Sequence, residues 1–498
     1  MKFELKKFSL AMAGAIGAAG FAGQALALDP SVYTTANTLD VYLSGASAQD
    51  AGIRAMMRRV CVPGTLDAFT DTNQALYFCQ VNTGQVSGLS KPNIAVRKLS
   101  AGGSGNGVQP VANSTNRTFF DLAAIKANPA SCGATSSVTA VTSSTDTIGL
   151  PAYVTRACAS ATYLTTVAPP DAGFSDVEPA LFGATTTELN NLEVHSANAV
   201  IFSIIATKKL RDALQTAQGL VSGSDSEANM PSLKTDQVAS MLNGNLTNWS
   251  QIALPGTAGG VLVNTSAGAG ADNIFIARRV SSSGTQTFAQ VHFLNQGCAV
   301  GVQPFVSAND TAPATSGLSC GGNVNARVYQ GSGGGDVKNC MIAHDTAGRW
   351  AIGILTTEDS SPTATSNTWR TIKLDGYAPT QLNVFEQNYD YWSEQTLQWR
   401  STTNPLSGDK LTFMNALVNK LGDPFVVSQL DLGTVHPWGN AGLMALGLNY
   451  VPLDPSSGPV SASAVAASPI TTATRAPTGN TNNCQPPVVL YPTTTQAQ

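Results

Sequence analysis

A turn of arginine, serine and glycine at residues 277–285 most constrains how this chain folds. It follows an apolar run at 274–276 that predicts a strand, and it precedes residues 286–294, which predict a helix. The first backbone N–H groups of a helix lack partners within the helix, and the helix dipole makes that end positive. The turn therefore predicts a strand-to-helix junction that can hold a phosphate-like anion.

Strand and helix patterns alternate along most of the chain, which at 498 residues is too long for one core. Residues 391–399 fit either a strand or a helix. Further strands are expected at 39–43, 94–99, 199–206 and 350–355, and helices at 49–59, 236–242, 413–421 and 424–432. This alternation predicts an α/β fold with mixed sheets flanked by helices, in which ligands bind beyond the carboxyl ends of strands.

The first 27 residues have the pattern of a secretory signal peptide. Basic residues precede an apolar segment at 8–26, and Ala25-Leu26-Ala27 forms an A-x-A cleavage site. We expect a mature chain that begins near Leu28 and is periplasmic or secreted, without a lipid anchor because no cysteine follows the cleavage site. A membrane anchor is the alternative interpretation of this segment, and no later segment has the ~18 continuous apolar residues that a bilayer span needs.

Charge excludes two classes of partner. Charged residues make up 12% of the chain, below the usual ~25%, and the net charge is −4. Without a basic face or an arginine-rich run, the chain is not expected to bind nucleic acid or anionic membranes.

Eight cysteines in an exported chain predict disulfides, and the absence of a C-x-x-C pair argues against a metal site. Three pairs are expected because each brackets one loop-rich insert, namely Cys61–Cys79, Cys132–Cys158 and Cys298–Cys320. Cys340 would then pair with Cys484 and tie the tail to the body. The four histidines, His195, His292, His344 and His436, are scattered and have no expected ligand role.

Six short motifs, taken in order, resemble those of the phosphate-binding members of the type II periplasmic solute-binding proteins. They are 43–48 (LSGASA), 103–107 (GSGNG), 174–179 (FSDVEP), 242–249 (LNGNLTNW), 278–285 (RRVSSSGT) and 351–354 (AIGI). The resemblance spans residues 39 to about 400 and is interrupted by inserts. It implies two hinged α/β lobes that close on one oxyanion, no enzymatic activity and no cofactor.

The resemblance also implies a domain plan and partners. Lobe I would comprise residues 28–206 and about 386–454, with inserts near 61–92 and 110–165, and lobe II residues 207–385. Residues 455–498 form a Ser/Thr/Pro-rich C-terminal tail, expected to be extended. The chain would be a monomer that binds inorganic phosphate, or a similar oxyanion, for an ABC transporter permease.

The residues that would line the cleft follow from the same motifs: Ala48, Gln49, Ser104, Asp176, Arg279, Ser283, Gly284 and Thr285. Backbone N–H groups of Ala48 and Gln49 would face the anion, and Arg279 would give charge-assisted bonds to its oxygens. Asp176 would discriminate between ligands, because a carboxylate only accepts hydrogen bonds and so favours protonated phosphate over sulfate. Considered alone, Asp176 has an alternative role as a helix cap. Arg278 is expected at the surface.

Two positions depart from the family pattern. Gln49-Asp50 stands where the family usually has Thr-Phe, and Ser281 stands where it has an aspartate beside the arginine. The ligand could accordingly be a related oxyanion. Two alternative functions stay open: a secreted phosphomonoesterase with Ser283 as nucleophile, and a surface or matrix protein that kept the fold and lost ligand binding.

Overall fold

The computed structural model describes residues 27–142, 149–158, 164–253, 261–265, 272–302, 304–311, 320, 327–358, 362, 368–432, 435–455 and 458–490. The expected signal peptide lies outside these ranges, apart from its last residue. Across the described ranges, no helix has the length and apolar character needed to cross a membrane.

A 14-stranded mixed sheet runs through the molecule in the order β13-β12-β14-β10-β17-β9-β1-β4-β3-β2-β7-β6, and β15 and β20 also pair with β10. Its strands are β1 (Thr38–Gly45), β2 (Asp67–Thr70), β3 (Gln74–Gln80), β4 (Asn93–Leu99), β6 (Ser136–Val138), β7 (Tyr153–Ala157), β9 (Ala172–Ser175), β10 (Leu192–Thr207), β12 (Phe275–Arg279), β13 (Val328–Gly331), β14 (Ala351–Thr356), β15 (Trp369–Thr371), β17 (Trp392–Arg400) and β20 (Leu443–Met444).

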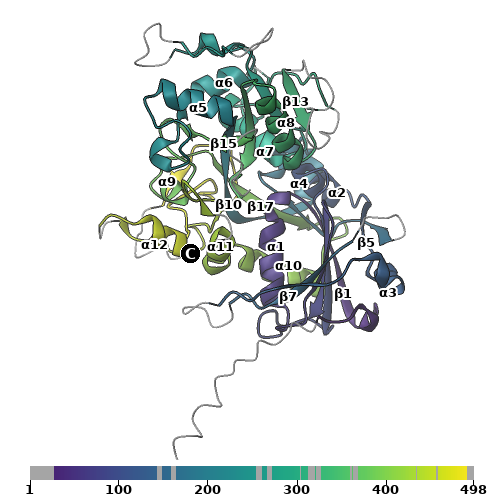
Figure 1. Cartoon of the computed structure of the whole chain (residues 1–498). Coiled ribbons are helices and arrows are strands. Elements are labelled where there is room, and N and C mark those ends of the chain that lie inside the picture. Colours follow the sequence, from purple (N-terminus) through teal and green to yellow (C-terminus); the bar gives the residue numbers. More distant parts are fainter. Residues whose placement is uncertain are drawn as a thin grey trace, which may run out of the picture.

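Strand β10 joins two halves of this sheet. Its first part pairs with β17, from Leu192 opposite Arg400 to Ile201 opposite Trp392. Its last part pairs with β14, beginning with Phe202 opposite Thr356. We call the half that contains β1–β9 lobe I and the half that contains β12–β14 lobe II; Figure 1 shows lobe I in purple and blue below lobe II in teal and green.

Helices flank both halves. Lobe I carries α1 (Asp50–Val60) and α10 (Gly408–Leu421), and lobe II carries α5 (Lys208–Ala217), α7 (Gly284–Leu294) and α8 (Gly334–Thr346) (Figure 1). The remaining helices are α2 (Gln109–Ala112), α3 (Leu122–Ala127), α4 (Thr186–Asn190), α6 (Thr235–Leu242), α9 (Gln381–Phe385), α11 (Pro424–Leu432) and α12 (Ala462–Ala467). The expected fold class, α/β with a mixed sheet flanked by helices, is confirmed.

Short elements complete the chain. Two-stranded pairs form between β5 (Arg117–Phe120) and β8 (Thr165–Ala168), β11 (Ser232–Leu233) and β16 (Lys373–Leu374), β18 (Val435–His436) and β19 (Gly439–Asn440), and β21 (Ala473–Thr474) and β22 (Val488–Val489). The 3-10 turns are η1 (Pro30–Val32), η2 (Ser47–Gln49), η3 (Ser104–Gly107), η4 (Pro129–Ser131), η6 (Pro179–Phe182), η7 (Glu227–Asn229) and η8 (Trp249–Gln251).

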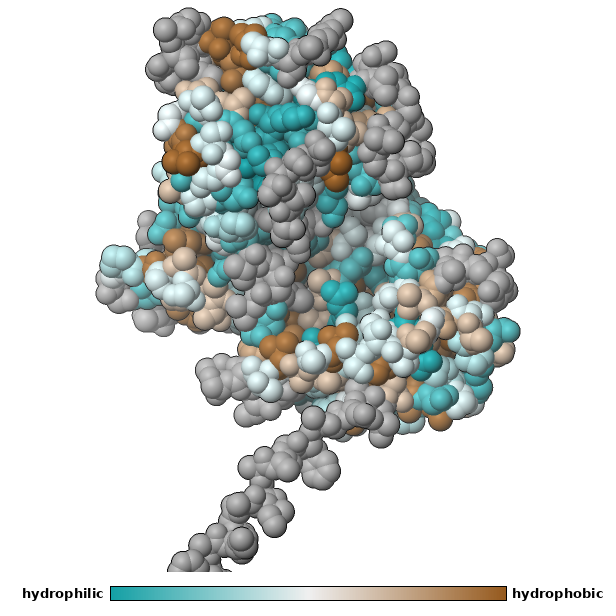
Figure 2. All heavy atoms as spheres, in the orientation of Figure 1, coloured by the Kyte–Doolittle hydropathy of each residue, from teal (hydrophilic) through white to brown (hydrophobic). Residues whose placement is uncertain are grey.

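Apolar burial explains why β10 can join the lobes. From Ala197 to Thr207 every residue of this strand is buried, because helices and neighbouring strands cover both of its faces. The exposed large hydrophobic residues among those described are single valines and Tyr377. Figure 2 accordingly shows scattered brown patches on the visible face rather than one broad apolar surface.

The structure resolves one open alternative and adds detail to the insert regions. The ambiguous segment near 391–399 is the strand β17, because its residues pair with β10 on one side and with β9 on the other. The insert regions contain β2, β3 and β7, and these strands extend the lobe I sheet instead of lying outside it. Non-local pairing of this kind has no local sequence signal beyond alternation.

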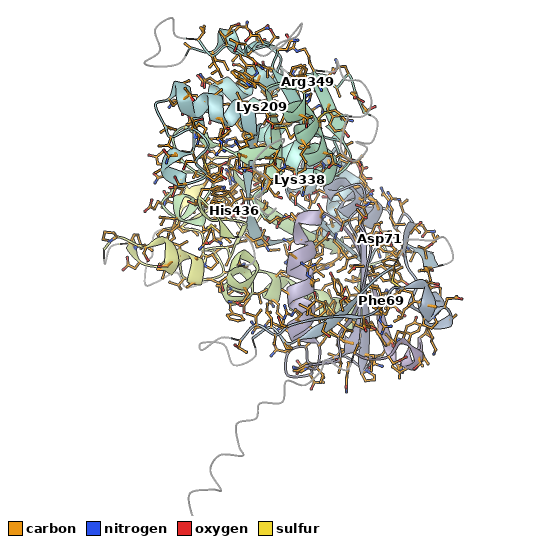
Figure 3. All side chains as sticks on the ribbon, viewed as in Figure 1. Phe69, Asp71, Lys209, Lys338, Arg349 and His436 are labelled. Carbon is orange, nitrogen blue, oxygen red and sulfur yellow. A yellow bond between two sulfur atoms is a disulfide. The ribbon has the colours of Figure 1, made fainter. Side chains whose placement is uncertain are left out.

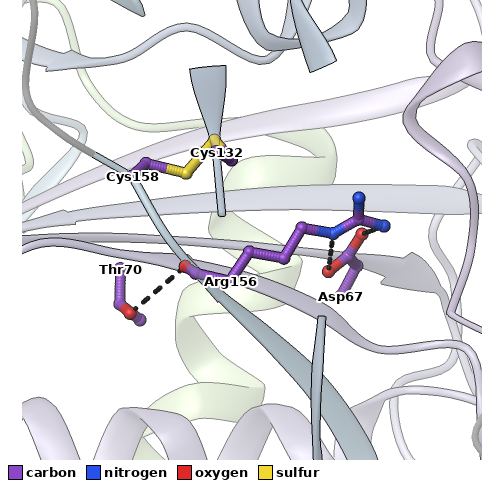
Figure 4. The surroundings of a disulfide bond; sticks show 5 residues. All are labelled: Asp67, Thr70, Cys132, Arg156 and Cys158. Atoms are coloured by element: carbon purple, nitrogen blue, oxygen red, sulfur yellow. Dashed lines mark hydrogen bonds and ion pairs between the residues drawn. A yellow bond between two sulfur atoms is a disulfide. The ribbon is translucent and has the colours of Figure 1, made fainter. Parts of the chain in front are cut away.

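The edge of lobe I is held by a disulfide and a buried ion pair (Figure 4). Arg156 of β7 donates from Nη2 to Oδ2 of Asp67 in β2 over 2.9 Å. Burial raises the pKa of Asp67 to about 6, while the guanidinium of Arg156 opposes that shift. Parallel pairing of β2 with β7 brings the two side chains together, and Cys132–Cys158 closes the neighbouring turn.

Two of the four expected disulfides are present in the structure. Cys61–Cys79 and Cys132–Cys158 are confirmed. The other two expected pairs are wrong, because the structure joins Cys298 to Cys484 and Cys320 to Cys340. Cys340 lies on α8 within lobe II and is buried there, so it is out of reach of the tail and pairs within its own lobe.

The C-terminal tail packs against both lobes and is not simply extended. It contains α12 and the β21–β22 pair, and Arg475 within it is only 3% exposed. Arg475 donates to the carbonyl oxygens of Trp392 and Asp390 over 2.9 and 2.7 Å. Asn483, also in the tail, donates from Nδ2 to Oε2 of Glu178 in lobe I. The next residue, Cys484, forms a disulfide with Cys298, which follows α7 of lobe II.

We expect the Cys298–Cys484 disulfide to stabilise the fold more than a short-range one. Its partners are 186 residues apart in sequence, against 18 for Cys61–Cys79. In the chain-entropy model this difference makes the double substitution Cys298→Ser/Cys484→Ser about 2 kcal/mol more costly than Cys61→Ser/Cys79→Ser. Urea unfolding of both variants measures the two losses. Equal losses would contradict a role for the tail in holding the lobes.

Candidate functional site

Three lobe I strands end at one edge of the sheet. β1 runs parallel to both β4 and β9, so their carboxyl ends lie together. Ala46 and η2 follow β1, residues 100–103 follow β4, and Asp176 follows β9. The turns that the sequence singled out in lobe I are therefore neighbours in space.

Lobe II presents a similar edge. β12 is parallel to β13 and to β14, so their carboxyl ends also lie together. Arg279 is the last residue of β12, the loop before α8 follows β13, and Glu358 comes shortly after β14. Each lobe thus offers backbone turns and polar side chains from the ends of three strands.

A pocket of about 630 Å³ lies between these edges. Lobe I contributes Ser47, Ala48, Thr72, Asn73, Ser100, Ala101 and Gly102 to its lining, and lobe II contributes Arg279, Thr285, Ser332, Gly333, Gly334, Gly335, Asp336, Lys338, Asn339, Leu355, Thr356 and Glu358. Figure 3 labels Lys338, a residue of α8, above the upper end of α1, and it labels Asp71, next to the pocket residue Thr72, on the lobe I side.

Arg279 supplies a guanidinium to this pocket while being only 8% exposed. Its Nη2 donates to the carbonyl oxygen of Ser332 over 2.9 Å, and its backbone N–H donates to Oε1 of Gln286 over 3.2 Å. These bonds fix the side chain at the mouth of α7. Ser283, at the N-cap of α7, makes no side-chain capping bond, so the positive end of that helix adds to the charge of Arg279.

The lobes touch directly beside the pocket. The backbone N–H of Gly105 in lobe I donates to the carbonyl oxygen of Ser282 in lobe II over 2.9 Å. A Cβ atom on Gly284 would lie 2.4 Å from Oγ of Ser104 and 2.5 Å from Oδ2 of Asp176. Glycine at 284 is therefore what allows α7 to approach lobe I this closely.

Asp176 lies at the centre of this contact and is 4% exposed. Its Oδ1 accepts a hydrogen bond from Nε2 of Gln395 over 2.8 Å, and its backbone N–H donates to Oγ of Ser104 over 3.1 Å. Burial raises the pKa of Asp176, and the Gln395 bond, Arg279, Ser104 and Lys98 oppose that shift. The carboxylate is thus held by neutral donors within the reach of two cations.

A chain of buried amides continues from Asp176 toward α1. Gln395 of β17 also contacts Gln49, and Nε2 of Gln49 donates to Oδ1 of Asn198 over 2.7 Å. All three amide side chains are fully buried. The register of β10 against β17 shifts between Ser196 and Asn198, and such a bulge turns a side chain toward a specific neighbour. The network fixes Asp176 from the side opposite Gly284.

Asp50, a departure from the family pattern, is neutralised locally. Oδ1 of Asp50 lies 3.0 Å from Nζ of Lys98 and 2.7 Å from Oγ of Ser100. Lys98 is 2% exposed and also donates to the carbonyl oxygens of Gly45 and Ala46 over 3.1 Å. The extra carboxylate therefore pairs with a buried ammonium instead of adding an unpaired negative charge.

The structure divides the predicted site residues into two groups. Ala48, Arg279 and Thr285 line the pocket. Ser104, Asp176, Ser283 and Gly284 are buried in the interlobe contact outside the pocket lining, and Gln49 is buried in the amide network with Asn198 and Gln395. That the second group touches a ligand stays a prediction. Arg278 was expected at the surface, but it is 9% exposed and stacks over the ring of Phe305 at 5.3 Å.

Sequence reasoning missed several residues of this region. Residues 331–335 span the end of β13, a two-residue loop and the start of α8, and their glycine run after a strand was the available signal. Lys98 is buried next to Arg97 in strand β4, and two basic residues within a strand that follows the apolar run 94–96 were a second signal. Asp336 caps the same loop by accepting bonds from the backbone N–H groups of Ser332 and Gly333 over 2.8 and 3.0 Å. Nothing local distinguished Gln395 or Asn198, whose roles arise from strand pairing.

One cluster in the described part of the chain has metal-ligating groups at short range, namely Cys320, Cys340 and His344. Its two sulfur atoms are joined in a disulfide, so neither is a thiolate. Burial lowers the pKa of His344 to about 3, and the nearby Arg349 acts in the same direction. The cluster lies in the core of lobe II, apart from the pocket lining.

Comparisons with known proteins give structural neighbours only. No protein-family model matches the chain, and no curated protein matches it. A putative phosphate ABC transporter substrate-binding protein with bound phosphate from Clostridium perfringens is 11% identical, with a TM-score of 0.39 over 79% of this chain and 98% of that chain. An ABC-type phosphate transport receptor from Vibrio cholerae is 14% identical, with a TM-score of 0.31 over 52% and 78%.

A possible phosphate binding protein from Planctomyces limnophilus is 9% identical, with a TM-score of 0.29 over 53% of this chain and 74% of that chain. These likenesses are low in both identity and TM-score.

We expect Gly284→Ala to push the lobes apart. The added methyl group would meet Cβ and Oδ2 of Asp176 at 2.5 Å, and the Cβ atom cannot rotate away. Overpacking of this kind costs about 1–3 kcal/mol, which thermal unfolding measures. Gly133→Ala is the matched control, because its new Cβ would meet its nearest neighbour at an ordinary 3.5 Å. Equal stability of the two variants would argue that the lobes do not touch here.

Proposed function

We propose that this chain is an exported solute-binding protein that holds an oxyanion-bearing solute, with inorganic phosphate as the first candidate, in the pocket between its lobes. The observation that carries the proposal is the position of Arg279. Its guanidinium lies at the carboxyl end of β12, lines a pocket with walls from both lobes, and adjoins the uncapped start of α7. Guanidinium and helix N-terminus both favour oxyanions.

The sequence motifs support the same function. Two of the six motifs that resemble those of phosphate-binding periplasmic proteins, 43–48 and 278–285, contribute residues to the pocket lining, and the signal-peptide pattern fits an exported protein. Within the proposal, Ser104 and Asp176 act on the ligand from the interlobe contact behind the pocket, and an ABC transporter permease receives the ligand. In this proposal the pocket binds its solute without chemical conversion. Ligand contacts from both lobes stabilise the closed arrangement.

The decisive experiment titrates ligand-stripped protein with phosphate and with sulfate by calorimetry at neutral pH. We expect phosphate to bind and Arg279→Met to weaken its binding about 10- to 100-fold, the value of a charge-assisted bond or pair of bonds. Arg278→Met is the matched control, because its guanidinium stacks on Phe305 outside the pocket lining. Absence of binding to phosphate, to sulfate and to the phosphate esters named below would remove the proposal and favour a fold that has lost its ligand.

Asp176 predicts a pH dependence for sulfate. Its pKa is raised by burial, so it takes up a proton at a higher pH than an ordinary aspartate. Sulfate keeps its charge from neutral to mildly acidic pH, and it is repelled only while Asp176 is ionised. Sulfate affinity should accordingly increase as pH falls below neutrality.

The substitution Asp176→Asn tests this interpretation. The neutral amide removes the repulsion at every pH, so the variant should bind sulfate more tightly at neutral pH and with little further change on acidification. Calorimetric titrations at several pH values measure both trends. A wild-type protein whose sulfate affinity does not change with pH would exclude Asp176 as the group that distinguishes the ligands.

A further inference from the structure

We infer that the solute is a small hydroxylated organic phosphate monoester and not free orthophosphate; this inference rests on the proposed function and concerns the same pocket. The volume of the pocket exceeds what orthophosphate needs. The pocket measures about 630 Å³. Orthophosphate has five heavy atoms, and at the ~30 Å³ that each water occupies in the liquid it would displace at most about 150 Å³. Pockets of several hundred Å³ usually hold organic ligands.

The anion-binding groups of lobe II lie at the start of α7. Arg279 and Thr285 occupy the end of the pocket at the start of α7. The backbone turn at Ser47 and Ala48 faces them from lobe I. This end suffices for one phosphoryl group, so the remaining space is available to whatever the phosphoryl group is attached to.

A further argument is the chemistry of that remaining space. Lobe I offers the hydroxyl of Thr72 and the amide of Asn73, and lobe II offers Lys338, Asn339 and Thr356. Leu355 is the one large apolar side chain among the lining residues described. Hydroxyl and amide groups that line a pocket select partners with hydroxyl groups and disfavour an alkyl chain, because an alkyl chain would remove exposed groups such as Thr72 and Asn73 from water without replacing their hydrogen bonds.

The charge of the lining limits the ligand to one phosphoryl group. Arg279 and Lys338 are basic, whereas Asp336 and Glu358 are acidic. The lining therefore has no net positive charge to hold a second phosphoryl group, and the two carboxylates would repel it. Lys338 and Asn339 then act as specificity-determining residues for the organic part of the ligand.

Calorimetric titration of ligand-stripped protein with glycerol 3-phosphate, a hexose 6-phosphate, a hexose 1,6-bisphosphate and orthophosphate tests the inference. We expect at least one monoester to bind tenfold or more tightly than orthophosphate, and the bisphosphate to bind more weakly than the monoester. The double variant Lys338→Met/Asn339→Ala should weaken the monoester at least fivefold and leave orthophosphate within twofold. Unchanged orthophosphate binding also shows that the variant is folded.

The matched control is Lys373→Met, which removes the same charge on β16 outside the pocket lining and should change neither affinity. Orthophosphate that binds as tightly as every monoester, or a monoester affinity that the double variant leaves unchanged, would overturn this inference and leave the proposed function standing. Binding of none of the four probes would overturn the proposed function itself.

Discussion

Pairing of β10 with β17 of lobe I and with β14 of lobe II is the constraint on which the rest of the structure depends. The first part of β10 pairs with β17 and its last part pairs with β14, so one continuous strand belongs to both lobes. Main-chain hydrogen bonds of this kind need partners wherever the strand is buried, and β10 is buried from Ala197 onward. The carboxyl edges of the two half-sheets face one another because this strand sets their relation. The pocket is the space left between those edges.

Close approach of the lobes has an electrostatic cost that the buried amides offset. Gly284 brings α7 against Asp176, which removes water from the carboxylate and raises its pKa. The bond from Gln395, itself bonded within the network of Gln49 and Asn198, replaces part of the lost hydration. A buried acidic group that is hydrogen-bonded but still perturbed is typical of a functional site, and here it lies beside the pocket.

The C-terminal tail couples the lobes a second time. Arg475 is buried between Phe288 of α7 and Trp392 of β17, with its guanidinium 5.3 and 5.1 Å from the two ring centres. Burial lowers the pKa of Arg475 to about 10, and Asp390, Glu394 and Glu178 oppose that shift. Together with Cys298–Cys484, these contacts limit how far the lobes can separate.

The sequence by itself determined the α/β class, most strands and helices, and the turns at which polar residues gather, because these features follow from local periodicity and from glycine. It placed Ala48, Arg279 and Thr285 in turns that do line the pocket. Tertiary structure decided which turns meet, how Cys298, Cys320, Cys340 and Cys484 pair, and that Lys98 neutralises Asp50. Those outcomes depend on how helices and strands pack together, with partners up to 186 positions apart for Cys298–Cys484, and local sequence carries no record of that packing.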